Sequence, residues 1–402
     1  MRKIVILLCI VTLGGIAPLR AQTKPAAKRG YQFTDTKVMP CTPVKDQAMS
    51  GTCWAFSGLS FLESEAMRAG KEAVDLAPMW VVRNAYIEKA IKYVRMCGTI
   101  TFSPGGAVLD VFDIVRKYGI VPMEVYQGLN YGTTEHRHSE LHSALKGYVA
   151  AIARNPNRSI STAWLDGFIG ILDAYLGPAP EKFVYKGTEY TPQTFAASLG
   201  LDMDDYISLT SFTHHPFYTT FPIEVEDNWS WGYSYNLPLE EFVSVLSGAV
   251  DKGYTIYWDS DATEGGFAST KGYAVIRAIT IDNVEEKDRE RWLAMNPVEQ
   301  RMFISNQGRC PWKEVEVTQE MRQKAFDSQA TSDDHGMHII GKAVDQTGSE
   351  FFKVKNSWGT NGQDYGGYFY ASRPYVTYKT ICAVVNRNAV PKEILKKFDR
   401  KK

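Results

Sequence analysis

The segment from Gln47 to Phe56 most constrains how this chain can fold, because it places a cysteine at the start of a helix. Cys53 follows a Gly-Thr turn and opens an apolar run whose residues recur with helical spacing: Ala55, Leu59, Leu62 and Ala66. The positive end of the helix macrodipole favours a thiolate, the nucleophile that acyl transfer needs. Upstream, the Gln47 amide can donate a hydrogen bond to an oxyanion. Taken alone, however, Cys53 fits a buried structural cysteine equally well.

A base and a group that orients it are expected near the other end of the chain. His335 precedes a predicted strand at 338–344, and Asn356 ends a second predicted strand at 350–356. Two paired strands would hold His335 and Asn356 side by side. Asn356 would then bind one imidazole nitrogen and leave the other for the thiol, while Trp358 screens that hydrogen bond from water. Together these residues predict the site of a cysteine peptidase.

Three segments resemble papain-type cysteine peptidases. They are Cys53-Trp54-Ala55-Phe56-Ser57 with Gln47 upstream, Asp334-His335-Gly336, and Lys355-Asn356-Ser357-Trp358-Gly359-Thr360. The pair Gly105-Gly106 before a predicted helix also matches that family. The resemblance implies a papain-like fold with two lobes. The helical lobe would carry the nucleophile, and an antiparallel, barrel-like lobe would carry the base.

The resemblance also implies a role for each matched residue. The roles are nucleophile for Cys53, general base for His335, orienting group for Asn356, oxyanion donor for Gln47, main-chain partners of the substrate for Gly105 and Gly106, and shield for Trp358. A simple turn is the alternative for the two glycines. The expected partners are peptides or proteins, and neither a metal nor a cofactor is expected. We expect Asp333 and Asp334 to be solvated or to cap a strand, and three histidines to lie on the surface: His136, His138 and His142.

Within the family, the chain most resembles the bleomycin hydrolase and aminopeptidase C branch. It has little room for a pro-domain, a large insertion between its halves, and the segment Val390-Pro391-Lys392-Glu393-Ile394-Leu395. In that branch a C-terminal arm places a carboxylate in the cleft, where it captures the amine of the substrate. The basic segment 396–402 would bind an ammonium group poorly. An endopeptidase is therefore the alternative to an aminopeptidase, and a silent peptide-binding scaffold or an acyltransferase are further alternatives. The branch often forms hexamers, so a homo-oligomer stays open.

The order of the predicted elements, helical first and strand-rich last, favours an α+β protein. We predict a helical lobe at about 45–130, an insertion at about 130–235, and a β-rich lobe at about 236–395 that also takes the N-terminal segment. The predicted helices are 53–69, 78–96, 107–118, 138–154, 162–176 and 237–252. The predicted strands are 254–258, 338–344, 350–356 and 365–372, with further extended structure at 217–235. Residues 284–330 are expected to be helical or loop.

The first 21 residues have the pattern of a signal peptide. Arg2 and Lys3 precede an apolar run at 4–16, which is shorter than the about 20 residues that cross a membrane. We therefore expect an exported protein, periplasmic or extracellular, without an integral membrane segment. Pairing among the remaining cysteines besides Cys53 stays open: Cys41, Cys97, Cys310 and Cys382. Equal numbers of basic and acidic residues, 45 each, give no support for nucleic-acid binding.

Overall fold

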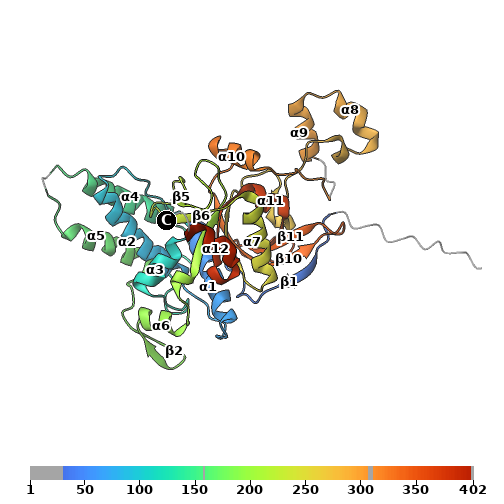
Figure 1. Ribbon diagram of the computed structural model, residues 1–402. Coiled ribbons are helices and arrows are strands. Elements are labelled where there is room, and N and C mark those ends of the chain that lie inside the picture. The colour runs from blue at the N-terminus through green and yellow to red at the C-terminus, as the bar shows by residue number, and fades with distance from the viewer. Residues whose placement is uncertain (1–29, 157–158, 307–310, 400–402) are drawn as a thin grey trace, which may run out of the picture.

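The computed structural model describes residues 30–156, 159–306 and 311–399, and its two parts meet along α1 (Cys53–Arg68). The helices of the first half of the chain gather on one side, and a large sheet with its covering helices forms the other (Figure 1). The predicted α+β fold is thereby confirmed. The expected signal peptide lies outside the described residues. No helix among those described is long and apolar enough to cross a membrane.

The helical part contains the helices that the periodicity predicts. After α1 they are α2 (Pro78–Arg95), α3 (Asp110–Tyr118), α4 (Ser139–Ala153) and α5 (Ala163–Leu176). The short α6 (Pro192–Ser198) was not predicted. A small hairpin, β2 (Phe183–Tyr185) and β3 (Thr188–Tyr190), precedes α6. Every residue of α1 from Trp54 to Ala66 is buried, including the predicted stripe. Helix α1 is therefore a central element, covered on all sides.

The other part is built on one sheet, with strand order β5-β6-β4-β13-β7-β10-β11-β12-β9-β8 and β1 alongside β10. The strands are β1 (Thr34–Val38), β4 (Tyr206–Thr210), β5 (Thr220–Pro222), β6 (Tyr233–Asn236), β7 (Ile256–Ser260), β8 (Phe267–Ala268), β9 (Tyr273–Ala274), β10 (His335–Val344), β11 (Glu350–Lys355), β12 (Tyr368–Ser372) and β13 (Thr380–Asn386). Most neighbours are antiparallel, but β4 pairs with β6, and β12 with β9, in parallel. Helices α7 (Leu239–Asp251) and α11 (Arg373–Lys379) pack on this sheet.

Five strands of this sheet are missing from the sequence prediction: β1, β4, β13 and the two-residue strands β8 and β9. Every residue of β4 and β13 is buried, so neither strand shows the polar alternation that marks a half-exposed strand. Strand β1 is largely exposed and short. Extended structure at 217–235 is confirmed only at β5 and at the start of β6. Residues 223–232, between these two strands, form turns.

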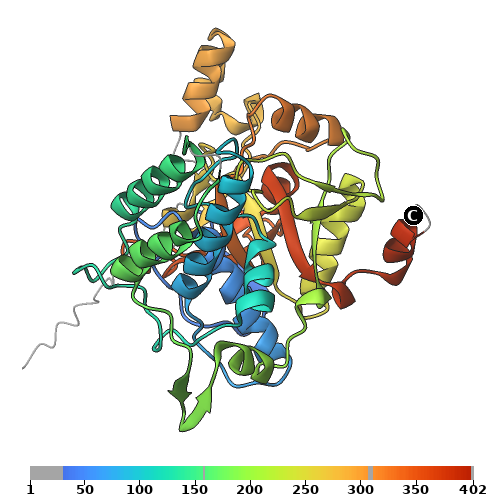
Figure 2. The same cartoon turned by 90° about the vertical axis from the view of Figure 1, so that its left-hand side faces the viewer.

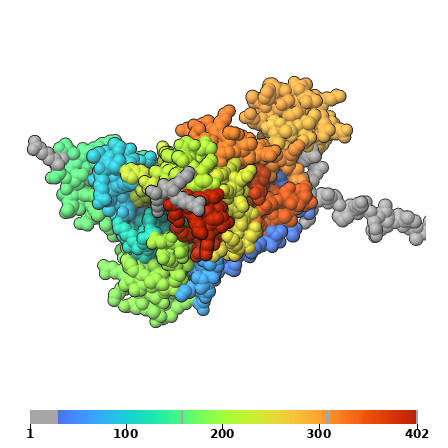
Figure 3. All heavy atoms as spheres, in the orientation of Figure 1, coloured from blue at the N-terminus to red at the C-terminus, as the bar shows by residue number. Residues whose placement is uncertain are grey.

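Residues 284–330 contain α8 (Arg289–Leu293), α9 (Pro297–Asn306) and α10 (Gln319–Asp327). Helices α8 and α9 project from the body of the molecule in both ribbon views (Figures 1 and 2). The last helix, α12 (Lys392–Asp399), lies on the surface beside α7 (Figure 3). There Lys397 pairs with Glu241 of α7 at 2.6 Å.

Two expectations about single residue types can now be compared with the structure. The prediction of surface histidines is wrong for His136 and His138, which are 5% and 1% exposed. The segment before α4 is drawn inward by backbone hydrogen bonds with Met49, which accepts from His138 and donates to His136.

Among the cysteines that the structure describes, none is in a disulfide: Cys41, Cys53, Cys97 and Cys382. Cys310 lies outside the described residues.

A buried lysine fixes the loops that flank the strand carrying His335. Lys379 at the end of α11 is 1% exposed and pairs with the equally buried Asp261 at 3.1 Å. It also contacts Glu264 and donates to the Ala330 carbonyl at 2.7 Å. Loops 261–264 and 330–334 therefore meet at one buried charge, which holds them together at the end of β10 that carries His335.

Replacing Lys379 with methionine is expected to lower the free energy of unfolding by about 3–5 kcal/mol, because Asp261 would remain buried without its cation. Urea denaturation measures the loss. Lys324→Met, at an exposed lysine of α10, is the control and should change the free energy by less than about 0.5 kcal/mol. An equal effect of the two variants would contradict the assigned role.

Candidate active site

Cys53 opens α1 and lines a cavity of about 320 Å³ together with Gln47, His335 and Trp358. The first N–H groups of a helix lack acceptors within the helix, so the backbone around Cys53 presents free donors. The Gly336 amide donates to the Cys53 sulfur at 3.5 Å. The structure thus brings the predicted nucleophile together with residues nearly 300 positions away.

The imidazole of His335 is oriented by the side chain of Asn356, as the sequence predicts. His335 Nε2 lies 2.7 Å from Asn356 Oδ1. The same oxygen accepts the Ser357 amide at 2.8 Å, which identifies it as the oxygen of the side chain. Because this oxygen only accepts, His335 carries its proton on Nε2 and keeps Nδ1 free as a base. The two residues lie at the start of β10 and directly after β11, which are neighbours in the sheet.

Gln47 is held so that its amide nitrogen is the group left for a ligand. The Ser357 hydroxyl donates to Gln47 Oε1 at 2.6 Å, and the Gln47 backbone amide donates to the Ser357 carbonyl at 2.8 Å. With the oxygen occupied, Nε2 is the donor available in the cavity. Sequence reasoning missed Ser357 because its role depends on a contact across the fold.

Trp358 covers the His335 imidazole. The two rings are stacked, with centroids 4.4 Å apart and planes 22° apart. Trp358 is itself 36% exposed. It therefore separates the hydrogen bond between His335 and Asn356 from solvent on one side, as the resemblance implies.

Gly336 allows β10 to approach the start of α1 closely. A Cβ atom at this position would lie 2.9 Å from Ser57 Oγ and 3.1 Å from Trp54 Cα. Any larger residue would push the strand carrying His335 away from the helix carrying Cys53. Glycine at this position is thus a geometric requirement of the site.

Gly105 and Gly106 line the same cavity from the loop before α3. A Cβ on Gly106 would lie 2.7 Å from the Trp54 ring. The buried Lys89 of α2 donates to the Ser103 carbonyl at 2.9 Å and also to the Gly105 carbonyl. Hydrogen bonds from Lys89 to two backbone carbonyls therefore fix the loop. No pattern in the sequence indicated this role, since lysines on helices are normally solvated.

Four carboxylates line this cavity, and the sequence predicted none of them there: Asp227, Asp259, Asp333 and Asp334. The expectation that Asp333 would be solvated or cap a strand is wrong, because its Oδ2 atom is buried and has no hydrogen-bond partner among the described residues. Asp334 is exposed and accepts the Ala262 amide at 3.3 Å. No sequence signal marked Asp227, which comes from the turns between β5 and β6.

Two family models match the chain. The Papain family cysteine protease model matches residues 31–164, and the Peptidase C1-like family model matches residues 313–402. Aminopeptidase C of Lactobacillus delbrueckii subsp. lactis is 23% identical over 96% of this chain and 91% of that protein. Aminopeptidase C of Lactobacillus helveticus is 21% identical, over 89% of this chain and 82% of that protein.

A solved structure shows the same fold. The crystal structure of PepW from Lactobacillus rhamnosis HN001 covers 92% of this chain and 85% of that one, with a TM-score of 0.67 and 19% identity. The chain is a papain-like cysteine peptidase. The family models and the relatives support its assignment to the aminopeptidase C and bleomycin hydrolase branch, which its sequence resembles.

The peptidase has a larger cavity of about 450 Å³ between α2, α3 and residues 229–231. Its lining contains neither a cysteine nor a histidine. The smaller cavity around Cys53 is therefore the one that can support acyl transfer.

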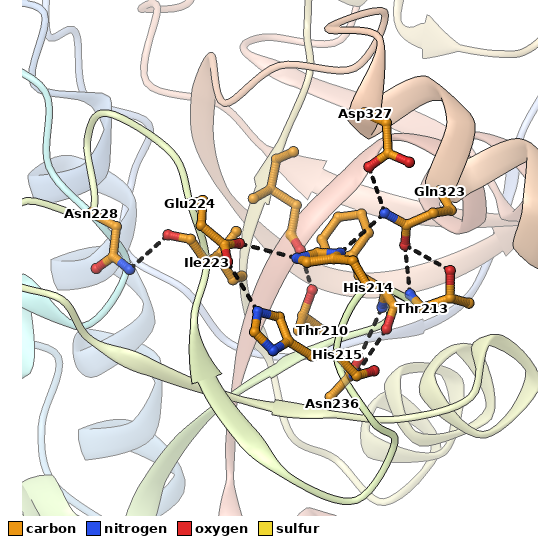
Figure 4. Close-up of polar contacts among 12 residues, drawn as sticks. Thr210, Thr213, His214, His215, Ile223, Glu224, Asn228, Asn236, Gln323 and Asp327 are labelled. Atoms are coloured by element: carbon orange, nitrogen blue, oxygen red, sulfur yellow. Dashed lines mark hydrogen bonds and ion pairs between the residues drawn. The ribbon is translucent and has the colours of Figure 1, made fainter.

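One cluster in the described part of the peptidase has the geometry of a metal site. The ligand atoms of His214, His215 and Glu224 lie within 4.8 Å of one another (Figure 4). Each imidazole Nε2 lies 3.0 Å from a different Glu224 oxygen. Gln323 donates to His214 Nδ1, so the His214 proton is on Nε2, where a metal would bind. Hydrogen bonds to Glu224 thus account for the cluster, and its residues do not line the cavity around Cys53.

Burial controls the protonation of the two reacting groups. It raises the pKa of Cys53 to about 12, although the hydrogen bond from Gly336 opposes this shift. Burial lowers the pKa of His335 to about 4, and the hydrogen bond with Asn356 opposes that shift. Burial outweighs these hydrogen bonds, so near neutral pH the Cys53 thiol is protonated and the His335 imidazole is neutral. The imidazole is then ready to take the thiol proton.

The rate at which iodoacetamide alkylates Cys53 is expected to fall as the pH drops through about 4. Because the pKa of His335 is lowered, its imidazole is neutral above that pH and can accept the thiol proton, whereas below it the imidazole is already protonated. Mass spectrometry of the Cys53 peptide measures the rate. An inflection near 6.5, the pKa of a solvated histidine, would contradict the buried environment.

Proposed function

We propose that this peptidase is an exported aminopeptidase that hydrolyses peptide bonds through an acyl-enzyme on Cys53. The observation that carries the proposal is the oriented pair of His335 and Asn356 beside the Cys53 thiol, in a cavity that also holds the Gln47 amide. The names of the relatives, Aminopeptidase C in two lactobacilli, support the aminopeptidase mode.

Each residue has one role in the proposed reaction. The proton of the Cys53 thiol passes to His335 Nδ1 while the sulfur attacks the scissile carbonyl carbon. The resulting oxyanion accepts hydrogen bonds from Gln47 Nε2 and from the Cys53 backbone amide. The imidazolium then protonates the leaving amine, and the carbon–nitrogen bond breaks. Asn356 keeps the imidazole in the productive orientation through both transfers.

Water completes the cycle by the same route. His335, neutral again, takes a proton from water as the oxygen attacks the thioester. The carbon–sulfur bond breaks, the acid product leaves, and the proton returns to the Cys53 sulfur. Gly105 and Gly106 are proposed to pair with the main chain of the substrate, and Trp358 to keep water from the hydrogen bond between His335 and Asn356.

The alternatives predict different products. An endopeptidase would cleave N-blocked peptides as well as free ones, and a silent scaffold would bind peptides without turnover. An acyltransferase would give a new amide when an amine is added. The silent scaffold is disfavoured by the presence of all four catalytic side chains in mutually consistent contacts.

Export is proposed from the basic and apolar pattern of residues 1–21. N-terminal sequencing of the protein recovered outside the cytoplasm would support it if the chain begins near residue 22. Recovery of the full-length chain from the cytoplasm alone would refute it.

Cys53→Ala is expected to lower kcat for leucine 7-amido-4-methylcoumarin by at least about 10³-fold, because no nucleophile remains. Asn356→Ala should lower kcat by about 10²-fold, because the imidazole is no longer oriented. Cys97→Ala, at an exposed cysteine just after α2, is the control and should keep full activity. Wild-type protein that neither cleaves a peptide pool nor is alkylated at Cys53 would refute the proposed function.

A further inference from the structure

We propose that Asp227, with the neighbouring pair Asp259 and Asp333, binds the α-ammonium group of the substrate and so restricts this peptidase to chain ends. The proposal rests on the proposed function, because it concerns the same cleft. It differs from the expectation that a C-terminal arm supplies the carboxylate, since these three groups come from other parts of the chain.

Asp227 stands where a long substrate would have to pass. Its carboxylate occupies the space that a Cβ atom on Gly105 would take. Ser103 Oγ donates to Asp227 Oδ1 at 2.9 Å, which leaves Oδ2 for a ligand. The papain resemblance places the substrate main chain along Gly105 and Gly106. A residue added before the first one would therefore meet the carboxylate, whereas a terminal ammonium would meet a counter-charge.

The segment that carries Asp227 is held in place. Asn228 Nδ2 donates to the carbonyls of Ile223 and Gly232 at 3.0 and 3.1 Å, and Asn228 Oδ1 accepts the Gly232 amide at 2.8 Å. At the start of the segment, Glu224 is tied to two histidines (Figure 4). Asp227 thus lies in a turn that hydrogen bonds hold at both ends, through Glu224 on one side and Asn228 on the other.

Asp259 and Asp333 provide further negative charge in the same cavity. Asp259, on β7, is 6% exposed, and it shares a hydrogen bond with Asp333. Such a pair holds one proton, since burial raises the pKa of Asp259 to about 6 and that of Asp333 further. The Asp333 Oδ2 atom remains buried without a partner among the described residues. It is a free acceptor for an N–H donor.

No lysine or arginine in the described chain forms an ion pair with Asp227, Asp259 or Asp333. The buried cation Lys89 instead donates to the carbonyls behind Gly105. An ammonium group offers three N–H donors and one positive charge, and so suits three carboxylates that have no cation in ion-pair contact. A positively charged ligand would therefore balance the negative charge of these carboxylates in the cleft.

A substrate side chain could bring the same chemistry, because lysine also ends in an ammonium group. The geometry favours the α-ammonium, since Asp227 closes the main-chain path that a residue before the scissile one would need. The described part of the C-terminus does not compete for this position. Helix α12 packs on Tyr235 and Glu241, which do not line the cavity (Figure 3).

The test compares leucine 7-amido-4-methylcoumarin with its N-acetylated form on three proteins. Wild type should prefer the free amine by at least about 10²-fold in kcat/KM, because acetylation removes a charge-assisted hydrogen bond from a buried site. Asp227→Asn should lower kcat/KM for the free amine by about 10-fold or more. Glu226→Gln, at the exposed acid next to it, is the matched control and should behave as wild type. Cys53 should be alkylated by iodoacetamide in all three proteins, which confirms a folded site; the rate itself is not compared, because the Asp227 charge raises the pKa of Cys53.

A second variant tests the steric part of the proposal. Asp227→Ala should raise kcat/KM for N-acetyl-alanyl-leucine 7-amido-4-methylcoumarin, because it opens the path beyond Gly105. Equal cleavage of free and acetylated leucine by wild type would overturn the proposal. So would a strong preference for N-acetyl-lysyl-leucine over N-acetyl-alanyl-leucine, which would assign the acids to a side chain. In both cases Cys53 chemistry would stand, whereas loss of all cleavage and alkylation would reject the proposed function and this proposal with it.

Discussion

The close approach of β10 to the start of α1 is the contact on which the site depends. Gly336 donates its amide to the Cys53 sulfur at 3.5 Å, and a side chain there would strike Ser57 and Trp54. Behind it, the Tyr257 hydroxyl of β7 donates to the Trp54 carbonyl at 2.9 Å. Since α1 is buried along its length, it cannot shift without repacking both lobes. The distance between nucleophile and base is therefore set by the core and not by a flexible loop.

The proposed catalytic residues were predictable because their chemistry needs fixed residue types in short local contexts. Cys53 at a helix start, and His335 and Asn356 at the ends of neighbouring strands, could be found from the sequence and lie where expected. Their supports could not be found in this way. Ser357 fixes Gln47, and Lys89 fixes the loop of Gly105, through contacts that join distant segments. No local pattern reports such contacts.

The fold was predictable where amphipathic periodicity exists and was missed where burial is complete. Helices with one buried face, such as α4 and α5, match the predicted ranges closely. Strands β4 and β13 lie in the middle of the sheet with both faces covered, so they lack alternation. His136 was placed on the surface because helical spacing says nothing of a segment pulled inward by backbone hydrogen bonds.

Buried acids without cations normally destabilise a fold, so their presence in a cleft needs a compensating role. The pair of Asp259 and Asp333 reduces the cost by sharing one proton, which the raised pKa of each carboxyl reflects. A bound ammonium favours the ionised form of Asp259, the carboxyl of the pair that loses its proton first, since it supplies the missing positive charge. Substrate binding and deprotonation are then linked, so affinity for a free amine should rise as the pH increases through about 6. An N-blocked substrate has no charge to offer and would leave the pair protonated. The same cleft can thus distinguish the end of a peptide from its middle by charge as well as by space.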